Sequence, residues 1–349
     1  MTTQERLKVG GPYFEDLEHG QVFEDAPALT LTPGHAAVHQ ALTGDRLRLP
    51  LDAELSRAVT GHQEPLAHPN LVCDVAIGQS TGPTQRVLGN LFYRGLILLR
   101  PVFIGDTLRT STEVVALKQN RPRPDGTASG LVALRIRTTN QHREPVLDFW
   151  RCPMIPLRDP EARTGHADRF DDIPEELDMP TVQGAVPDGW RYGLLGDRAG
   201  GEGPDGLEPG TVFEVEAGDT VTAAPELARL TLNVARAHTD ATGSLHGRRL
   251  VYGGHTISVA AAHTARALPG LATIVAWRSC DHPGPVFEGD VLSTELTLDA
   301  AEPLDAADAR LVDLRAAVSA HRDGEEGPVP VLDWRFIGVI PADPEGGSH

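Results

Sequence analysis

Cysteine and long apolar segments are scarce in this chain. Its 349 residues include three cysteines, Cys73, Cys152 and Cys280, and none belongs to a CxxC pair. This argues against a disulfide framework and against a structural zinc site. No apolar run approaches the roughly 20 residues that cross a bilayer, and the first residues lack the apolar core of a secretory signal. We therefore expect a cytoplasmic protein with reduced thiols and no membrane partner.

Positive charge is also in short supply. The chain has 31 Lys and Arg residues against 49 Asp and Glu residues, which gives a formal net charge of −18. Nucleic acids and anionic membranes are bound through basic surfaces, so this charge balance argues against both as partners. Hydrophobic residues make up 40% of the chain, which is ordinary for a folded globular protein and argues against wholesale disorder.

Several signature motifs are missing or lie outside their usual context. The chain has no GxxxxGK[ST] sequence, its one GxGxxG match (201–206) lies in a Gly-rich stretch at the end of a predicted linker, and its one GxSxG match (78–82) spans the end of a predicted helix. His35 and His39 have the i,i+4 spacing of helical metal ligands, but no HExxH motif or third ligand accompanies them. Asp281 and His282 form a pair without an evident nucleophile. We therefore expect no metal site and none of the nucleotide-binding or hydrolase sites that these motifs mark.

What the chain does contain is an internal repeat. Four segments recur in the same order at offsets between 184 and 190: residues 17–24 with 207–214, 101–108 with 285–292, 145–150 with 330–334, and 155–156 with 340–341. Such a repeat indicates two copies of one fold. We place the copies at residues 11–158 and 205–342. Residues 159–204, rich in Asp, Glu, Pro and Gly, are then predicted to form a linker that runs over the surface.

The two copies show the same succession of patterns. An apolar-periodic segment comes first, then a helical run rich in small residues, then strands with apolar and polar residues in alternation. An antiparallel sheet that covers the helix satisfies this order, so we predict an α+β fold in each copy. The first segments are 33–42 and 226–238, the helices are 70–79 and 254–268, the strands include 107–115, 131–137 and 292–298, and the hairpin turns are 123–126 and 322–324.

Two stretches of the second copy carry a family pattern. Residues 232–240 read Leu-Asn-Val-Ala-Arg-Ala-His-Thr-Asp, and Gly253-Gly254-His255-Thr256 opens the predicted central helix. The chain resembles the double-hotdog members of the MaoC-like hydratase/dehydratase family, whose motif is Gly-Asp-x-Asn-Pro-φ-His-x-Asp with φ apolar. Among them it is most similar to the mesaconyl-CoA hydratases, also called β-methylmalyl-CoA dehydratases. Residues 247–258, 90–93 and 117–120 extend this similarity.

The resemblance implies a double hotdog that adds or removes water across the double bond of an enoyl-CoA thioester. His238 is then the catalytic base, and Asn233, which stands where the family usually has Asp, orients the water. The backbone amides at Gly253, Gly254, His255 and Thr256 are expected to form the oxyanion hole or to contact substrate. No cofactor is implied beyond the CoA of the substrate. A homodimer is expected because isologous assembly is common.

Further candidates have two interpretations each. Arg248 and Arg249 either meet CoA phosphates or form a solvated pair. Asp45 matches the start of the motif in the first copy, where Pro50 replaces the histidine, so it is either vestigial or supporting. Asp240 either supports the site or closes a turn, and the side chain of His255 either contacts substrate or packs at the helix start.

Three other functions fit the same residues. The chain could be a dehydratase of secondary metabolism that acts on a CoA-bound or carrier-bound acyl group. It could be a non-catalytic thioester-binding protein, because Asp45 and His238 fall in different copies. It could also be a hotdog thioesterase, for which Asp74 in the first small-residue helix is the candidate carboxylate.

Overall fold

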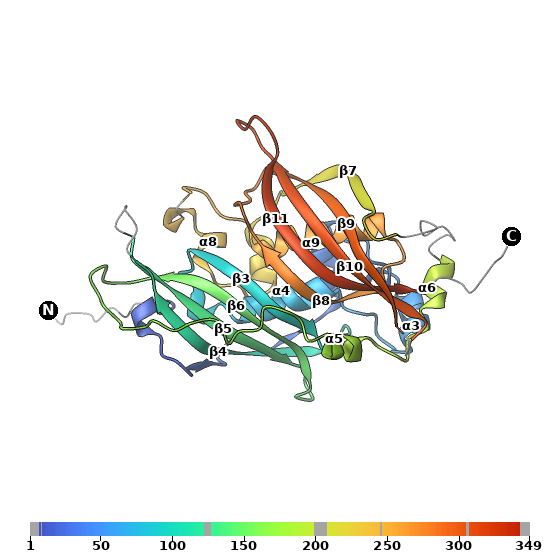
Figure 1. Ribbon diagram of the computed structural model, residues 1–349, viewed down its shortest axis with the longest axis horizontal. Coiled ribbons are helices and arrows are strands. Elements are labelled where there is room, and N and C mark those ends of the chain that lie inside the picture. The colour runs from blue at the N-terminus through green and yellow to red at the C-terminus, as the bar shows by residue number, and fades with distance from the viewer. Residues whose placement is uncertain are drawn as a thin grey trace.

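A computed structural model describes residues 7, 9–121, 127–198, 208–244, 246–304 and 307–342 (Figure 1). The hairpin turn predicted at 123–126 and the last part of the predicted linker, 199–204, lie outside the described residues. The helices are η1 (Phe14–Asp16), α1 (Pro33–Thr43), α2 (Arg48–Leu51), α3 (Ala53–Thr60), α4 (Pro69–Gln79), η2 (Gly82–Thr84), α5 (Met179–Ala185), α6 (Gly193–Arg198), α7 (Pro225–Leu230), α8 (Arg236–Thr239), η3 (Ala241–Gly243) and α9 (Gly253–Ala267).

The described strands form one sheet of eleven members. They are β1 (Val22–Phe23), β2 (Leu29–Thr30), β3 (Gly89–Leu98), β4 (Thr107–Gln119), β5 (Ser129–Thr139), β6 (Pro145–Pro156), β7 (Val212–Thr220), β8 (Thr273–Asp281), β9 (Val291–Leu304), β10 (Ala309–His321) and β11 (Val329–Pro341). Their order is β1-β4-β5-β6-β3-β8-β11-β10-β9-β7, with β2 paired to β4, and the pairings are antiparallel. The two halves of the chain thus meet edge to edge where β3 pairs with β8.

Each half wraps its own sheet around one central helix, α4 in the first half and α9 in the second (Figure 1). The two helices pack against each other, and the Asn70 side chain reaches the Ile257 carbonyl across the contact. Every residue of α4 is buried, because the sheet covers one side and α9 the other. This explains why the helix is apolar nearly all round instead of amphipathic.

The predicted strand alternation is present. In β4 and β9, buried residues alternate with partly exposed ones along most of the strand, which turns one face toward the central helix. The alternation of apolar and polar residues in the sequence therefore reflects a sheet that a helix covers on one face only.

One expected helix is broken, and the break matters for the site. The segment 226–238 was expected to be one apolar-periodic element, but α7 ends at Leu230 and α8 begins at Arg236. Between them Leu232 takes a left-handed conformation, with φ at 61°, which a continuous right-handed helix cannot include. The residues of the break are held by contacts to the first half, described below.

The segment between the halves has more structure than its composition suggests. It crosses the outer face of the sheet and forms α5 and α6, which bury Val182, Tyr192 and Leu195 (Figure 1). These side chains belong to an apolar cluster with Leu311 and Val339 of the second half. The segment has no core of its own and gains its burial by covering the sheet.

Candidate active site

A cavity of about 280 Å³ lies where the two halves meet. Both halves supply its walls. The first half contributes Ile77, Thr81, Thr84, Val87, Leu88, Gly89, Asn90, Tyr93 and Arg151; the second contributes Asn233, Ala235, Ala237, His238, His246, Leu250, Val251, Tyr252, Gly253, Thr256, His282, Pro283, Gly284, Pro285 and Val286. The predicted base, its Asn neighbour and the start of the central helix are therefore brought to one cavity.

His238 is poised to accept a proton. Its Nδ1 lies 2.9 Å from the Leu250 carbonyl oxygen, which can only accept, so Nδ1 carries the proton and donates it. This leaves Nε2 unprotonated, and it has no hydrogen-bond partner among the described residues. The side chain is 9% exposed, and burial lowers its pKa below the ordinary 6.5. His238 is therefore a neutral base at physiological pH.

Asn233 lies in the break between α7 and α8. Its Oδ1 accepts a hydrogen bond from the Ala235 backbone amide at 2.9 Å, which fixes which end of the side-chain amide is oxygen. The Nδ2 group has no partner in the described part of the chain. The side chain thus offers the cavity a donor, which can hold a water through its oxygen but cannot take a proton from it.

The first half holds this loop in place. The Val234 amide donates to the Thr81 hydroxyl at 2.9 Å, and the Arg236 amide donates to the Gln85 carbonyl at 3.0 Å. Gly78 of α4 lies so close to the loop that a β-carbon at this position would overlap the Thr231 carbonyl. The position of Asn233 thus depends on residues from the other half of the chain.

The start of α9 forms the opposite wall. The amides of Gly253 and Gly254 are the first of a 15-residue helix, and no side chain caps them. Free amides at a helix N-terminus favour negative charge. Side chains are excluded at both positions: a β-carbon on Gly253 would lie 2.9 Å from His282 Nε2, and one on Gly254 would overlap the Asp74 carboxyl. Of the two, Gly253 lines the cavity, and Gly254 follows it directly, so the free amides of this helix start lie at or next to the cavity wall.

Comparisons with known proteins identify the family. Residues 2–273 match the family model described as mesaconyl-CoA hydratase. A mesaconyl-CoA hydratase of Cereibacter sphaeroides is 33% identical over 95% of this chain and 98% of its own length. A beta-methylmalyl-CoA dehydratase of Chloroflexus aurantiacus is 30% identical over 95% and 97%. The chain belongs to the mesaconyl-CoA hydratase family. It is a MaoC-like hydro-lyase that acts on acyl-CoA, which confirms the predicted enzyme class.

Solved structures of relatives confirm the predicted double hotdog. A conserved hypothetical protein of Mycobacterium tuberculosis, described as having this fold, superposes with a TM-score of 0.87 at 47% identity, over 95% of this chain and 99% of the other. A putative MaoC domain protein dehydratase of Chloroflexus aurantiacus gives a TM-score of 0.82 at 26% identity, over 97% and 100%. The family assignment and the fold therefore agree.

Not every residue that the sequence pointed to lines the cavity of this family member. The His255 ring faces α1, where Nε2 lies 3.1 Å from the Leu42 carbonyl, and its backbone amide donates to the Tyr252 carbonyl. Neither group is available to a substrate. Thr256 is buried and does line the cavity. Of the four predicted positions, Gly253 and Thr256 thus line the cavity, and Gly254 and His255 do not.

Three charged candidates make contacts outside the cavity. Arg249 forms an ion pair with Glu288 at 2.7 Å, and Arg248 donates to the carbonyl of the same residue. Asp240 accepts from the amide and hydroxyl of Thr242 and closes a turn. Arg248 is exposed and keeps its charge on the surface, whereas Arg249 and Asp240 are engaged within the protein.

Asp45 lies in a different cavity, also of about 280 Å³, in the first half. Its Oδ1 is 3.1 Å from His68 Nε2 and also accepts from the Leu47 amide. Because the Asn70 amide donates to His68 Nδ1, the proton of this imidazole is on Nε2 and points to Asp45. The next residue, Pro69, has no amide proton to offer. The unprotonated nitrogen of His68 is therefore already engaged, and the helix start beside this cavity has a proline where its counterpart has a free amide.

Asp74 does not fit the thioesterase interpretation. It is buried between α4 and α9, where the Ser258 hydroxyl donates to Oδ2 at 3.3 Å, and it lines none of the cavities in the described part of the chain. Burial raises its pKa from 3.8 to about 8, so the carboxyl is mostly protonated at neutral pH. A buried, protonated carboxyl of this kind forms hydrogen bonds between the two helices and does not act as a nucleophile.

Two residues that line the cavity, His282 and Arg151, were not predicted as site residues from the sequence. His282 stands against Gly253, and its Nε2 lies 3.8 Å from the Cys280 sulfur; burial lowers its pKa to about 4, so it is neutral. Arg151 reaches the cavity from β6 of the first half. His282 was visible only as a pair with Asp281 that lacked a nucleophile, and Arg151 lies far from the motif in sequence.

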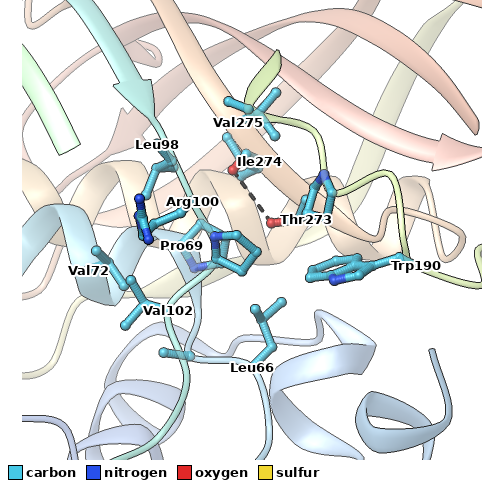
Figure 2. Close-up of a pocket in the computed structure, with 14 residues that line it drawn as sticks. Leu66, Pro69, Val72, Leu98, Arg100, Val102, Trp190, Thr273, Ile274 and Val275 are labelled. Carbon is cyan, nitrogen blue, oxygen red and sulfur yellow. Dashed lines mark hydrogen bonds between the residues drawn. The ribbon is translucent and has the colours of Figure 1, made fainter. Parts of the chain in front are cut away.

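A smaller space elsewhere does not compete with this site. A pocket of about 20 Å³ lies beside Leu66, Val102 and Trp190, where residues that precede α6 cross the junction of the halves (Figure 2). It has room for about one water molecule and shares no lining residue with the cavity at His238. Among the described residues, no group of three or more side chains is arranged to hold a metal ion, and no helix is long and apolar enough to cross a membrane.

Proposed function

We propose that this protein adds water reversibly across the α,β double bond of an enoyl-CoA thioester at the cavity between its halves. The observation that carries the proposal is the unprotonated Nε2 of His238 in the same cavity as the uncapped start of α9. The reaction needs a base for the water and donors for the charge that develops on the thioester oxygen. The cavity supplies the base through His238 and the donors through the start of α9.

In the hydration direction, Nε2 of His238 takes a proton from a water as the water oxygen attacks Cβ. The electron pair of the double bond moves toward the thioester carbonyl, where the amides of Gly253 and Gly254 donate to the resulting enolate oxygen. The imidazolium then returns its proton to Cα, so that one water is added overall. Asn233 holds the water through its Nδ2 group and takes no part in proton transfer.

For the acyl group, we favour the branched dicarboxylic mesaconyl group in one direction and β-methylmalyl-CoA in the other. Support comes from two curated relatives that bear these substrates in their names and match nearly the whole chain. A CoA-bound or carrier-bound intermediate of secondary metabolism is the second candidate. We further propose that the protein is a homodimer, which sedimentation equilibrium would test.

The deciding experiment is a mass-spectrometric assay with mesaconyl-CoA and crotonyl-CoA. Wild-type protein should give a product heavier by one water, and His238→Ala should lower the rate roughly 100- to 10,000-fold, as for loss of a general acid-base group. His142→Ala is the matched control, because His142 is exposed in the turn after β5. Wild-type activity in the His238→Ala variant would remove His238 as the base. Thioester binding without turnover would favour the non-catalytic alternative.

A further inference from the structure

The cavity at His238 contains one formal charge in an otherwise acidic protein. Although the chain carries a net charge of −18, no Asp or Glu lines this cavity among the described residues. The only arginine that lines it is Arg151, which is 4% exposed. Its guanidinium stays protonated at any physiological pH, so its charge is held inside the protein. Buried charges are normally paired, and this one is not paired with a carboxylate in the described part of the chain.

The hydrogen bonds of Arg151 leave part of the guanidinium unused. Nη2 donates to the Ser80 carbonyl at 2.8 Å and to the Thr84 hydroxyl at 2.9 Å, both neutral acceptors. Nε is buried without any partner, and Nη1 has no hydrogen bond among the described residues. Nε and Nη1 lie on different edges of the guanidinium, so a carboxylate in the cavity would bind through Nη1, with one charge-assisted hydrogen bond.

The internal repeat shows that the fold does not require this arginine. The position that corresponds to Arg151 in the second half is Phe336, at the same offset of 185 that relates the flanking segments. Arg151 pairs with Tyr93 across β6 and β3, and Phe336 pairs with Trp277 across β11 and β8. The second half thus fills this place with aromatic rings, whereas the first half places a tyrosine and an arginine beside a cavity.

The arginine is linked to the reacting end of the cavity by a single turn. Ser80 and Thr84, which fix Arg151, flank Thr81, whose hydroxyl accepts from the Val234 amide. Val234 directly follows Asn233. Asn233 and Arg151 thus line one cavity from opposite halves of the chain and are connected through the turn at Thr81.

We propose that Arg151 binds the distal carboxylate of the acyl group and makes this enzyme selective for monothioesters of short dicarboxylic acids. The inference rests on the proposed function, since it assumes that the acyl group occupies this cavity. The phosphates of CoA are a poor match for Arg151, because they must reach solvent and this side chain is buried. Arg151 is a binding residue and takes no part in proton transfer.

Binding of unreactive analogues tests the inference apart from catalysis. Succinyl-CoA and butyryl-CoA share the CoA moiety and a four-carbon chain, but only succinyl-CoA ends in a carboxylate. By calorimetry, wild-type protein should bind succinyl-CoA about 10- to 100-fold more tightly, the range for hydrogen bonds to a charged group. Equal affinities for the two thioesters would overturn the inference.

Variants assign the preference to the residue. Arg151→Gln keeps a donor for Ser80 and Thr84 but loses the charge, and it should bind both thioesters about equally. Arg151→Lys keeps the charge without the planar fork and should retain part of the preference. The control is Arg135→Gln, which removes a partly exposed arginine of β5 that pairs with Asp148. A preference that survives unchanged in Arg151→Gln contradicts the proposal. If that variant does not fold, a full preference in Arg151→Lys contradicts it instead.

Kinetics separate this inference from the proposed function. If the enzyme hydrates crotonyl-CoA and mesaconyl-CoA, Arg151→Gln should lower kcat/KM for mesaconyl-CoA about 10- to 100-fold more than kcat/KM for crotonyl-CoA. An equal loss on both substrates would mean that Arg151 acts on the thioester or on CoA, and would refute the inference alone. Absence of turnover together with an Arg151-dependent preference for succinyl-CoA would refute the hydratase proposal alone.

Discussion

The protonated carboxyl of Asp74 should make the free energy of unfolding depend on pH. Burial raises its pKa from 3.8 to about 8 in the folded protein, whereas in the unfolded chain it titrates near its ordinary value. Between these two values the unfolded chain has lost a proton that the folded chain keeps. The stabilising contribution of the protonated form is therefore complete below pH 4 and is lost as pH rises toward 8. The slope is about 1.4 kcal/mol per pH unit, or about 3 kcal/mol between pH 5 and pH 7.

The perturbation that isolates this effect is Asp74→Asn. The amide has nearly the same shape, can still accept from the Ser258 hydroxyl, and does not ionise. Urea denaturation of both proteins at pH 5, 6 and 7 gives the difference in their free energies of unfolding. Histidines with lowered pKa values, such as His238, contribute slopes of the opposite sign, but they contribute equally to both proteins and cancel in the difference.

We expect the wild type to lose about 3 kcal/mol relative to Asp74→Asn from pH 5 to pH 7. A difference that does not change with pH would refute the reasoning. It would mean that the folded protein holds no extra proton at this site, and that the Asp74 carboxyl is ionised despite its burial. The variant should also keep its hydration activity, because Asp74 lines none of the three cavities described above.

Two further predictions concern the loop that carries the site. Because burial lowers the pKa of His238, the acid limb of kcat/KM should lie below pH 6.5. Asn233→Asp places a carboxylate nearby and should move this limb to higher pH, whereas an unmoved limb would show that residue 233 does not face the base. Gly78→Ala pushes a methyl group against the Thr231 carbonyl and should cost about 1–3 kcal/mol and lower kcat/KM. Gly184→Ala in α5 is the matched control, since open space there predicts a gain of up to about 1 kcal/mol in thermal unfolding; similar losses in both variants would contradict this account.

Much of the fold could be predicted because its signals are local. Alternation along β4 and β9 reflects a sheet with one covered face, and the repeat doubles the evidence for each element. The break at 231–235 could not be predicted in this way. Residues 226–238 are compatible with a helix, and the chain departs from it where the first half offers partners at Thr81 and Gln85. Contacts between segments 150 residues apart leave no trace in local periodicity.

The same division applies to the site. His238, Asn233 and the helix start belong to one half and to recognisable stretches, so sequence patterns could point to them. Arg151 lies on another strand of the other half, and no motif includes it. The sequence nonetheless marks its position. Buried positions of β6 largely alternate with partly exposed ones, and the internal repeat places Phe336 at the position that corresponds to Arg151. A charged residue at an inward position whose repeat mate is aromatic is a marker worth seeking in other tandem folds.

The two halves have diverged in a way that makes each necessary to the other. If both had kept an unprotonated histidine and free helix-start amides, the chain would hold two equivalent sites. Instead the first half blocks its own helix start with Pro69 and closes Asp45 against His68, while it braces the loop of Asn233 and supplies Arg151. On this view the first half determines which acyl group is accepted, and the second half performs the reaction.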